Sequence, residues 1–312
     1  MMRTEREQQK SFGEVLGELF HDEEVSLTLL FHLTDMSPEQ HEQFCQAWPE
    51  VDEERRRVIA RHLADISEEN FEVDFSPVFA FCLADVAEDV RLASLDGLWD
   101  TDRVSLIGPI VRLMEGDSST RVRALAAATL GHYVLMAEWG QIPQQPVTPA
   151  VDALLAQLDD VDSADMVKRA ALESVGAATH ERVRPLIDDA YRRGDREMRK
   201  SAVFAMGRSA DPHWLPIIRE EMYSESKEMR MEAARAAGEI ADSSAVPELA
   251  GLLEDGELEV VLAAVYALGQ IGDSRAQRLL AEMTEELPPG VVLDAVDEAL
   301  EELSWLGGEI DL

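Results

Sequence analysis

The sequence predicts an all-α protein, namely a solenoid of about seven antiparallel helix hairpins that follows an N-terminal helical cap. Three observations lead to this prediction. Glycines recur at an interval of 31 residues, prolines recur at the same interval, and no segment shows the β-branched alternation that is typical of strands. A constant interval of this length is typical of proteins in which one helical unit stacks on the next.

The cap is predicted at residues 1–50. Residues 11–14 read Ser-Phe-Gly-Glu, which is a capping box, and apolar residues follow it at helical spacing. Ser37 and Pro38 begin another helix in a similar manner. We expect these helices to cover the first repeat, and the alternative is a free helix that binds a partner.

The first helix of each repeat, helix A, carries one apolar stripe. Counted from the basic residue near its start, such as Arg91, positions −1, +3, +4 and +7 are apolar or small in every copy. Position +3 is always small, so we expect a neighbouring helix to approach closely there: Ser94, Ala126, Ala171, Ala202, Ala233, Ala264 and Ala295. A glycine at +8 is predicted to end helix A, because a left-handed residue costs least without a Cβ: Gly176, Gly207, Gly238 and Gly269. Trp99 takes this position in an earlier copy.

The second helix, helix B, is marked by proline. Pro185, Pro216 and Pro247 are each 31 residues apart, and each precedes an apolar segment. Proline in the first turn of a helix sacrifices no hydrogen bond. Helices A and B therefore form a hairpin whose apolar stripe is buried only by stacking on other hairpins. We predict that residues 51–312 form one continuous solenoid with a C-terminal cap.

This repeat resembles the short HEAT-type repeat. The closest resemblance is to the form of roughly 30 residues found in phycobilin lyase subunits and many bacterial scaffold proteins, and it is best in MRMEAARAAGEIADSSAVPELAGLLEDG (229–256) and VVLAAVYALGQIGDSRAQRLLAEM (260–283). The resemblance implies an armadillo-like helical solenoid that serves as a protein–protein interaction scaffold or adaptor without catalysis of its own. It also implies an alternative, an enzyme subunit that attaches or removes a bilin.

The composition limits the possible partners. The chain has 28 basic and 63 acidic residues, a formal net charge of −35, which disfavours binding to nucleic acids and to anionic membranes. No signal peptide or membrane-spanning run is found, so we expect a cytoplasmic protein. The seven histidines lack metal-ligand spacing, and neither phosphate-binding loops nor nucleophile motifs occur. We therefore expect no catalytic residue, cofactor or metal, and a partner that is another protein.

One copy of the repeat is longer than the others. Gly131 and Gly176 are 45 residues apart, and no charged residue lies between Glu138 and Asp152. We expect helix A to continue to Trp139 and to stop at Gly140. The segment QIPQQPVTP (141–149) should then return in an extended conformation, because its three prolines oppose a helix, and Thr148 should cap helix B.

Two groups of residues are candidates for partner contact. The first is the uncharged insertion, with Tyr133, Trp139 and Ile142, which alternatively folds back over neighbouring repeats. The second is a basic cluster that includes Arg182, Arg192 and Arg193, together with Trp214. Its alternatives are pairing with nearby acidic residues and, for the tryptophan, filling a gap. Residues 239–312 hold 2 basic and 18 acidic residues, which suits a soluble end cap or a surface for a basic partner.

Overall fold

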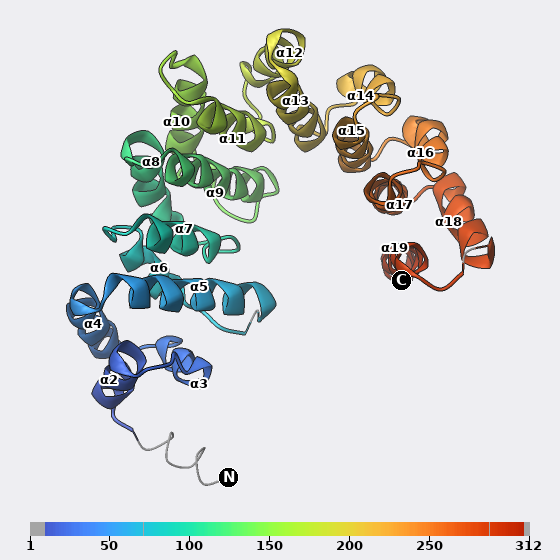
Figure 1. The fold of residues 1–312 in the computed structure, drawn as a ribbon. Coiled ribbons are helices and arrows are strands. Elements are labelled where there is room, and N and C mark those ends of the chain that lie inside the picture. The colour runs from blue at the N-terminus through green and yellow to red at the C-terminus, as the bar shows by residue number, and fades with distance from the viewer. Residues whose placement is uncertain (1–9, 71, 287, 309–312) are drawn as a thin grey trace. The chain divides into compact units, whose positions relative to one another are not determined.

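The computed structural model describes residues 10–70, 72–286 and 288–308 (Figure 1). This part of the chain contains 18 α-helices, several short 3-10 turns and no strand, so the all-α prediction is confirmed. The chain forms two compact units, residues 1–168 and 169–312, and the division falls within α11 (Asp165–Val175). The cap at residues 1–50 and the continuity of residues 51–312 stay predictions.

Unit 1 consists of antiparallel hairpins in two layers. Ser11 and Ser37 both form the capping boxes that begin α2 and α4. The A helices α5, α7 and α9 contact one another in sequence order, and the B helices α8 and α10 also touch. The bounds are α2 (Phe12–His21), α3 (Leu27–Leu30), α4 (Pro38–Ala47), α5 (Glu53–Glu69), α6 (Ser76–Cys82), α7 (Glu88–Asp96), α8 (Ile107–Gly116), α9 (Thr120–Glu138) and α10 (Thr148–Asp159).

Unit 2 repeats this arrangement. Its A helices α13, α15, α17 and α19 contact one another in order, and the predicted prolines lie in the first turns of α12, α14 and α16. The bounds are α12 (Val183–Arg193), α13 (Arg196–Arg208), α14 (Leu215–Glu221), α15 (Lys227–Ile240), α16 (Val246–Leu252), α17 (Leu258–Ile271), α18 (Ser274–Glu286) and α19 (Val291–Gly308).

The recurring glycine follows the end of helix A only at Gly176, directly after α11, and the prediction was wrong at Gly207, Gly238 and Gly269. Gly207 and Gly238 lie inside α13 and α15, and neither has a left-handed backbone. A Cβ at Gly207 would lie 2.7 Å from the Cα of Ala236 on the next A helix, and a Cβ at Gly238 would lie 2.8 Å from the Cα of Ala267. The glycine is therefore present because consecutive A helices touch at this point.

We expect Gly207→Ala to lower the free energy of unfolding by about 1–3 kcal/mol, because overpacking outweighs the better helix propensity of alanine. The matched control is Gly251→Ala in α16, where a Cβ would meet nothing within 4 Å. This control should leave the stability unchanged or slightly higher. Urea unfolding followed by circular dichroism measures both, and equal effects of the two substitutions would contradict the packing explanation.

In α7 and α15 the same ion pair explains the basic residue near the start of helix A. Arg91 Nε donates to Asp117 at 2.7 Å, and Arg230 Nε donates to Asp255 at 2.7 Å. Each aspartate also accepts the backbone N–H two residues later, just before the next A helix. Hydrogen bonding from Arg230 is the main cause that holds the pKa of the Asp255 carboxyl below its usual range. The arginine of one repeat thereby fixes the turn that begins the next repeat.

Candidate partner-binding groove

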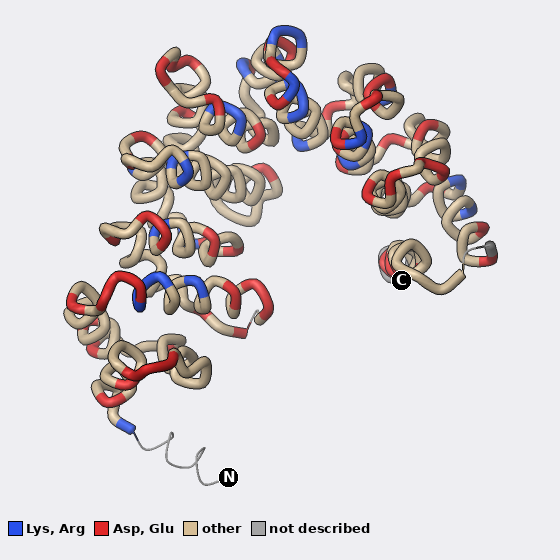
Figure 2. Tube along the Cα trace, in the orientation of Figure 1, with Lys and Arg blue, Asp and Glu red and all other residues tan. Residues whose placement is uncertain are grey.

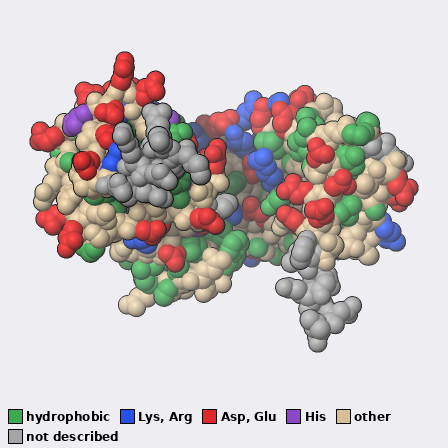
Figure 3. Space-filling view, turned by 90° about the horizontal axis from the view of Figure 1, so that it is seen from below, with side chains coloured by type: hydrophobic (Ala, Val, Ile, Leu, Met, Phe, Trp, Pro, Cys, Tyr) green, Lys and Arg blue, Asp and Glu red, His purple; other side chains and the backbone are tan. Residues whose placement is uncertain are grey.

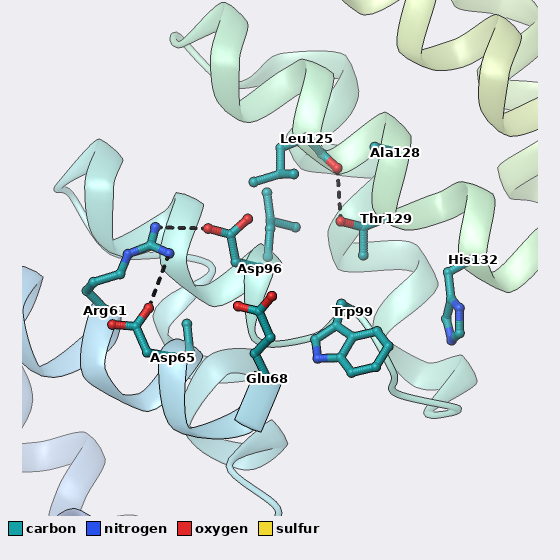
Figure 4. A pocket seen from close by; sticks show the side chains of 11 residues that line it. Arg61, Asp65, Glu68, Asp96, Trp99, Leu125, Ala128, Thr129 and His132 are labelled. Atoms are coloured by element: carbon teal, nitrogen blue, oxygen red, sulfur yellow. Dashed lines mark hydrogen bonds and ion pairs between the residues drawn. The ribbon is translucent and has the colours of Figure 1, made fainter. Parts of the chain in front are cut away.

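A cavity of about 610 Å³ opens on unit 1 across the three A helices α5, α7 and α9 (Figure 4). We call it the inner groove. Residues from successive turns of α5 line one wall of the groove. Residues at and just after the end of α7 also line it, and the middle of α9 forms the opposite side. Its lining residues are Arg61, Ala64, Asp65, Glu68, Leu95, Asp96, Trp99, Leu125, Ala128, Thr129 and His132.

One side of the inner groove is acidic. Arg61 Nη2 lies 2.9 Å from an Asp96 oxygen, and Arg61 Nη1 lies 3.9 Å from an Asp65 oxygen. Glu68, one turn after Asp65 on α5, forms no ion pair with any residue that the structure describes. The groove thus holds three carboxylates against one guanidinium, and that guanidinium is already paired.

The other side of the inner groove is largely apolar. Trp99 lies in the turn after α7, three residues past its end, and is 44% exposed, an unusual position for so large an apolar side chain. Leu125 and Ala128 of α9 face the same cavity, and Thr129 turns its hydroxyl away to donate to the Leu125 carbonyl oxygen at 2.9 Å. Figure 4 shows that Glu68 and Trp99 line the same cavity. The groove therefore combines an aromatic side chain with carboxylates.

The uncharged insertion lies in unit 1, where it folds inward. Tyr133 is fully buried and its hydroxyl donates to the Arg103 carbonyl oxygen at 3.4 Å, while burial raises the pKa of its phenol. Ile142 is buried as well. A direct contact of these two side chains with a partner does not fit their burial. Trp139 differs, because it is 66% exposed just past the end of α9.

The shape of the insertion agrees only in part with the sequence prediction. Helix α9 ends at Glu138, and Gly140 follows with a left-handed φ of 72°, as expected. The return is not extended, however, because the N–H groups of Val147 and Thr148 both donate to the Gln144 carbonyl oxygen and close a tight turn. Thr148 is the first residue of α10 and does not cap it, since its hydroxyl also donates to Gln144.

The basic cluster and Trp214 belong to unit 2. Lys and Arg residues cluster on α12 and α13 (Figure 2). Arg184 of α12 pairs with Asp211, outside its own helix, whereas the two arginines at the end of α12 pair within it. Arg192 contacts Asp188 at 2.8 Å and Arg193 contacts Asp189 at 2.7 Å. The Arg182 backbone N–H donates to the His180 ring at 3.2 Å. Trp214 is 1% exposed, so it fills the core and does not present a surface for a partner.

The described residues provide neither a metal site nor a membrane-spanning helix. Within residues 10–70, 72–286 and 288–308, no three His, Cys, Asp or Glu side chains gather in a way that could hold a metal ion. Cys45 and Cys82 are free thiols, and burial raises the pKa of the Cys82 thiol. None of the described helices is both long enough and apolar enough to cross a membrane.

Comparison with known proteins decides what the repeat is. The sequence model of the family described as HEAT repeats matches residues 212–301. The hairpins of this segment match HEAT repeats. The resemblance inferred from the glycine, alanine and proline spacing is thereby confirmed. A search of curated proteins finds no match.

Solved structures resemble this chain at low identity. YibA from Escherichia coli is 15% identical, with a TM-score of 0.45 over 90% of this chain and 99% of YibA. The CpcE–CpcF complex of phycocyanin lyase from Nostoc sp. is 16% identical, with a TM-score of 0.47 over 73% of this chain and 94% of that one. Human deoxyhypusine hydroxylase is 18% identical, with a TM-score of 0.34 over 97% of this chain and 98% of the hydroxylase.

The inner groove lies outside the segment that the HEAT repeat model matches. The sequence did not predict that Trp99, Glu68 and Arg61 line a common groove. A signal for Trp99 was present, because tryptophan stands there in place of the repeat's glycine. No comparable signal marks Glu68 and Arg61, since acidic and basic residues are common on every exposed helix face of this chain.

Proposed function

We propose that the protein is a scaffold or adaptor that binds a partner protein in the inner groove and performs no catalysis of its own. The observation that carries this proposal is the partly exposed Trp99 at the edge of a cavity that crosses three helices. Tryptophan is favoured at the centres of protein interfaces, because it buries a large area at little entropic cost. An open groove built by successive A helices also suits a polypeptide segment that runs across them.

Trp139 is a second contact in this proposal. Its 66% exposed ring lies just past the end of α9, the helix that carries Leu125 and Ala128. Deleting the insertion would remove the buried Ile142 along with it, so Trp139→Ala is the cleaner test. We expect this substitution to weaken capture of the partner and to leave the melting temperature unchanged.

A photo-crosslinking amino acid at position 128 tests the proposed function. Ala128 is exposed within the groove, and Glu115 on α8 is an exposed control position outside it. In cells of the source organism, position 128 should crosslink a defined protein, position 115 should not, and Trp99→Ala should abolish the crosslink. Identical products from both positions, or none from either, would contradict binding in the groove.

The alternative drawn from the resemblance to phycobilin lyase subunits stays a prediction. Incubation of the protein with a bilin and an acceptor protein, with each candidate partner present in turn, tests it. A covalent adduct with a visible absorption band would support bilin attachment. Absence of the band in every combination would leave the scaffold proposal as the better account.

A further inference from the structure

We infer that the occupant of the inner groove is a basic segment of the partner, whose arginine side chain lies on the Trp99 ring and pairs with Glu68. This inference rests on the proposed function and adds the chemistry of the partner. It depends on three features of the described residues: the charge of the lining, the presence of Glu68 and Trp99 in one cavity, and the apolar wall of α9.

The charge of the lining residues favours a positively charged occupant. Arg61 already contacts Asp96 and Asp65, so it has little to offer to an anionic ligand. Glu68 is exposed, and no described residue neutralises it. Figure 3 shows acidic side chains spread widely over the face it presents, in keeping with the formal net charge of −35. A cationic segment is attracted by this field, and an acidic one is repelled.

The position of Trp99 favours a guanidinium as the cationic group of the occupant. A guanidinium that stacks on an indole face gains a cation–π attraction, and its planar edge remains free to donate to a carboxylate. Glu68 lines the same cavity and is the carboxylate that accepts those hydrogen bonds in this proposal (Figure 4). Leu125 and Ala128 across the groove offer apolar contact to the methylene groups of the side chain.

The other possible occupants fit less well. An apolar helix in the groove would cover the carboxylates of Asp65, Glu68 and Asp96, and desolvation of a carboxylate without a cationic partner is costly. An acidic segment would have to compete with Asp96 for Arg61 at 2.9 Å. A basic segment leaves the existing ion pairs in place and neutralises Glu68.

The test uses short alanine–leucine peptides that carry one central residue: arginine, citrulline or glutamate. Citrulline has the shape of arginine without its charge. Binding is followed by the indole N–H resonances of the full-length protein, which has five tryptophans. The resonance of Trp99 is identified by its loss in Trp99→Phe.

We expect the arginine peptide to shift the Trp99 resonance, and the citrulline peptide to bind about tenfold more weakly. Glu68→Gln should also weaken the arginine peptide about tenfold. The matched control Glu115→Gln removes the same charge on α8, outside the groove, and should change the dissociation constant less than twofold. The glutamate peptide should leave the Trp99 resonance unshifted.

Equal binding of the arginine and citrulline peptides would overturn the inference. So would equal effects of Glu68→Gln and Glu115→Gln, because a general attraction to an acidic protein would then explain the binding. These outcomes are separate from the crosslinking result. A partner that crosslinks at position 128 while the arginine peptide fails would retain the groove as a binding site and reject only its proposed occupant.

Discussion

Arg91→Ala is expected to lower the free energy of unfolding by about 3–5 kcal/mol, because it leaves a buried carboxylate without its cation. The side chains of Arg91 and Asp117 are only 10% and 5% exposed, and two N–H groups of Arg91 donate to the two oxygens of Asp117. Arg91 also donates to the carbonyl oxygens of Asp85 and Val86 ahead of its own helix. Urea unfolding of the variant measures the loss.

Arg193→Ala is the matched control for this prediction. Arg193 pairs with Asp189 at 2.7 Å, but the two side chains are 81% and 56% exposed. Exposed pairs contribute little, so its removal should change the free energy of unfolding by less than about 1 kcal/mol. A similar loss in both variants would mean that burial does not set the strength of the recurring Arg–Asp pair. Hydrogen exchange should localise the effect of Arg91→Ala to α7 and the turn before α9.

The second large effect is expected at Glu232, a carboxyl on α15 that is only 9% exposed. Burial raises its pKa to about 7, with further contributions from Glu173 and Glu239, while Arg235 and Lys200 act in the opposite direction. The folded state therefore keeps a proton on Glu232 up to about pH 7, whereas the unfolded chain loses it near pH 4.5. Stability should fall as the pH rises between these values.

Glu232→Gln should remove this pH dependence. At pH 8 we expect the variant to be more stable than the wild type by roughly 3 kcal/mol, the value that corresponds to the shift in pKa. At pH 4.5 the two proteins should have similar stability. Glu225→Gln, an exposed carboxyl just before α15, is the control for the loss of one negative charge. An equal gain in both variants at pH 8, or no gain in Glu232→Gln, would contradict the prediction.

Local physical chemistry allowed much of the fold to be predicted. A helix N-terminus leaves unsatisfied N–H groups, so Ser11, Ser37 and the phased prolines reveal where helices begin. The apolar stripe of helix A has a period that only a helix matches. The end of α9 at Glu138, followed by Gly140, was predictable for the same reason, because it depends on neighbours in the chain.

Only the tertiary structure decided features that depend on distant parts of the chain. Glycine suits both a left-handed helix end and a close helix contact, and the approach of Ala236 identifies the second reason at Gly207. The inward fold of the insertion appears in the burial of Tyr133 and Ile142.

Dependence on distant residues also explains why the repeat was predictable from the sequence and the inner groove was not. The 31-residue spacing and the capping residues belong to segments of a few turns, so the sequence by itself determined a stack of helix hairpins. Trp99 lies 31 residues after Glu68 and 29 residues before Ala128, and the three residues belong to α5, the turn after α7, and α9. Their common cavity exists only because the stacking of α5, α7 and α9 brings them together, and no periodicity along the chain encodes the space between side chains.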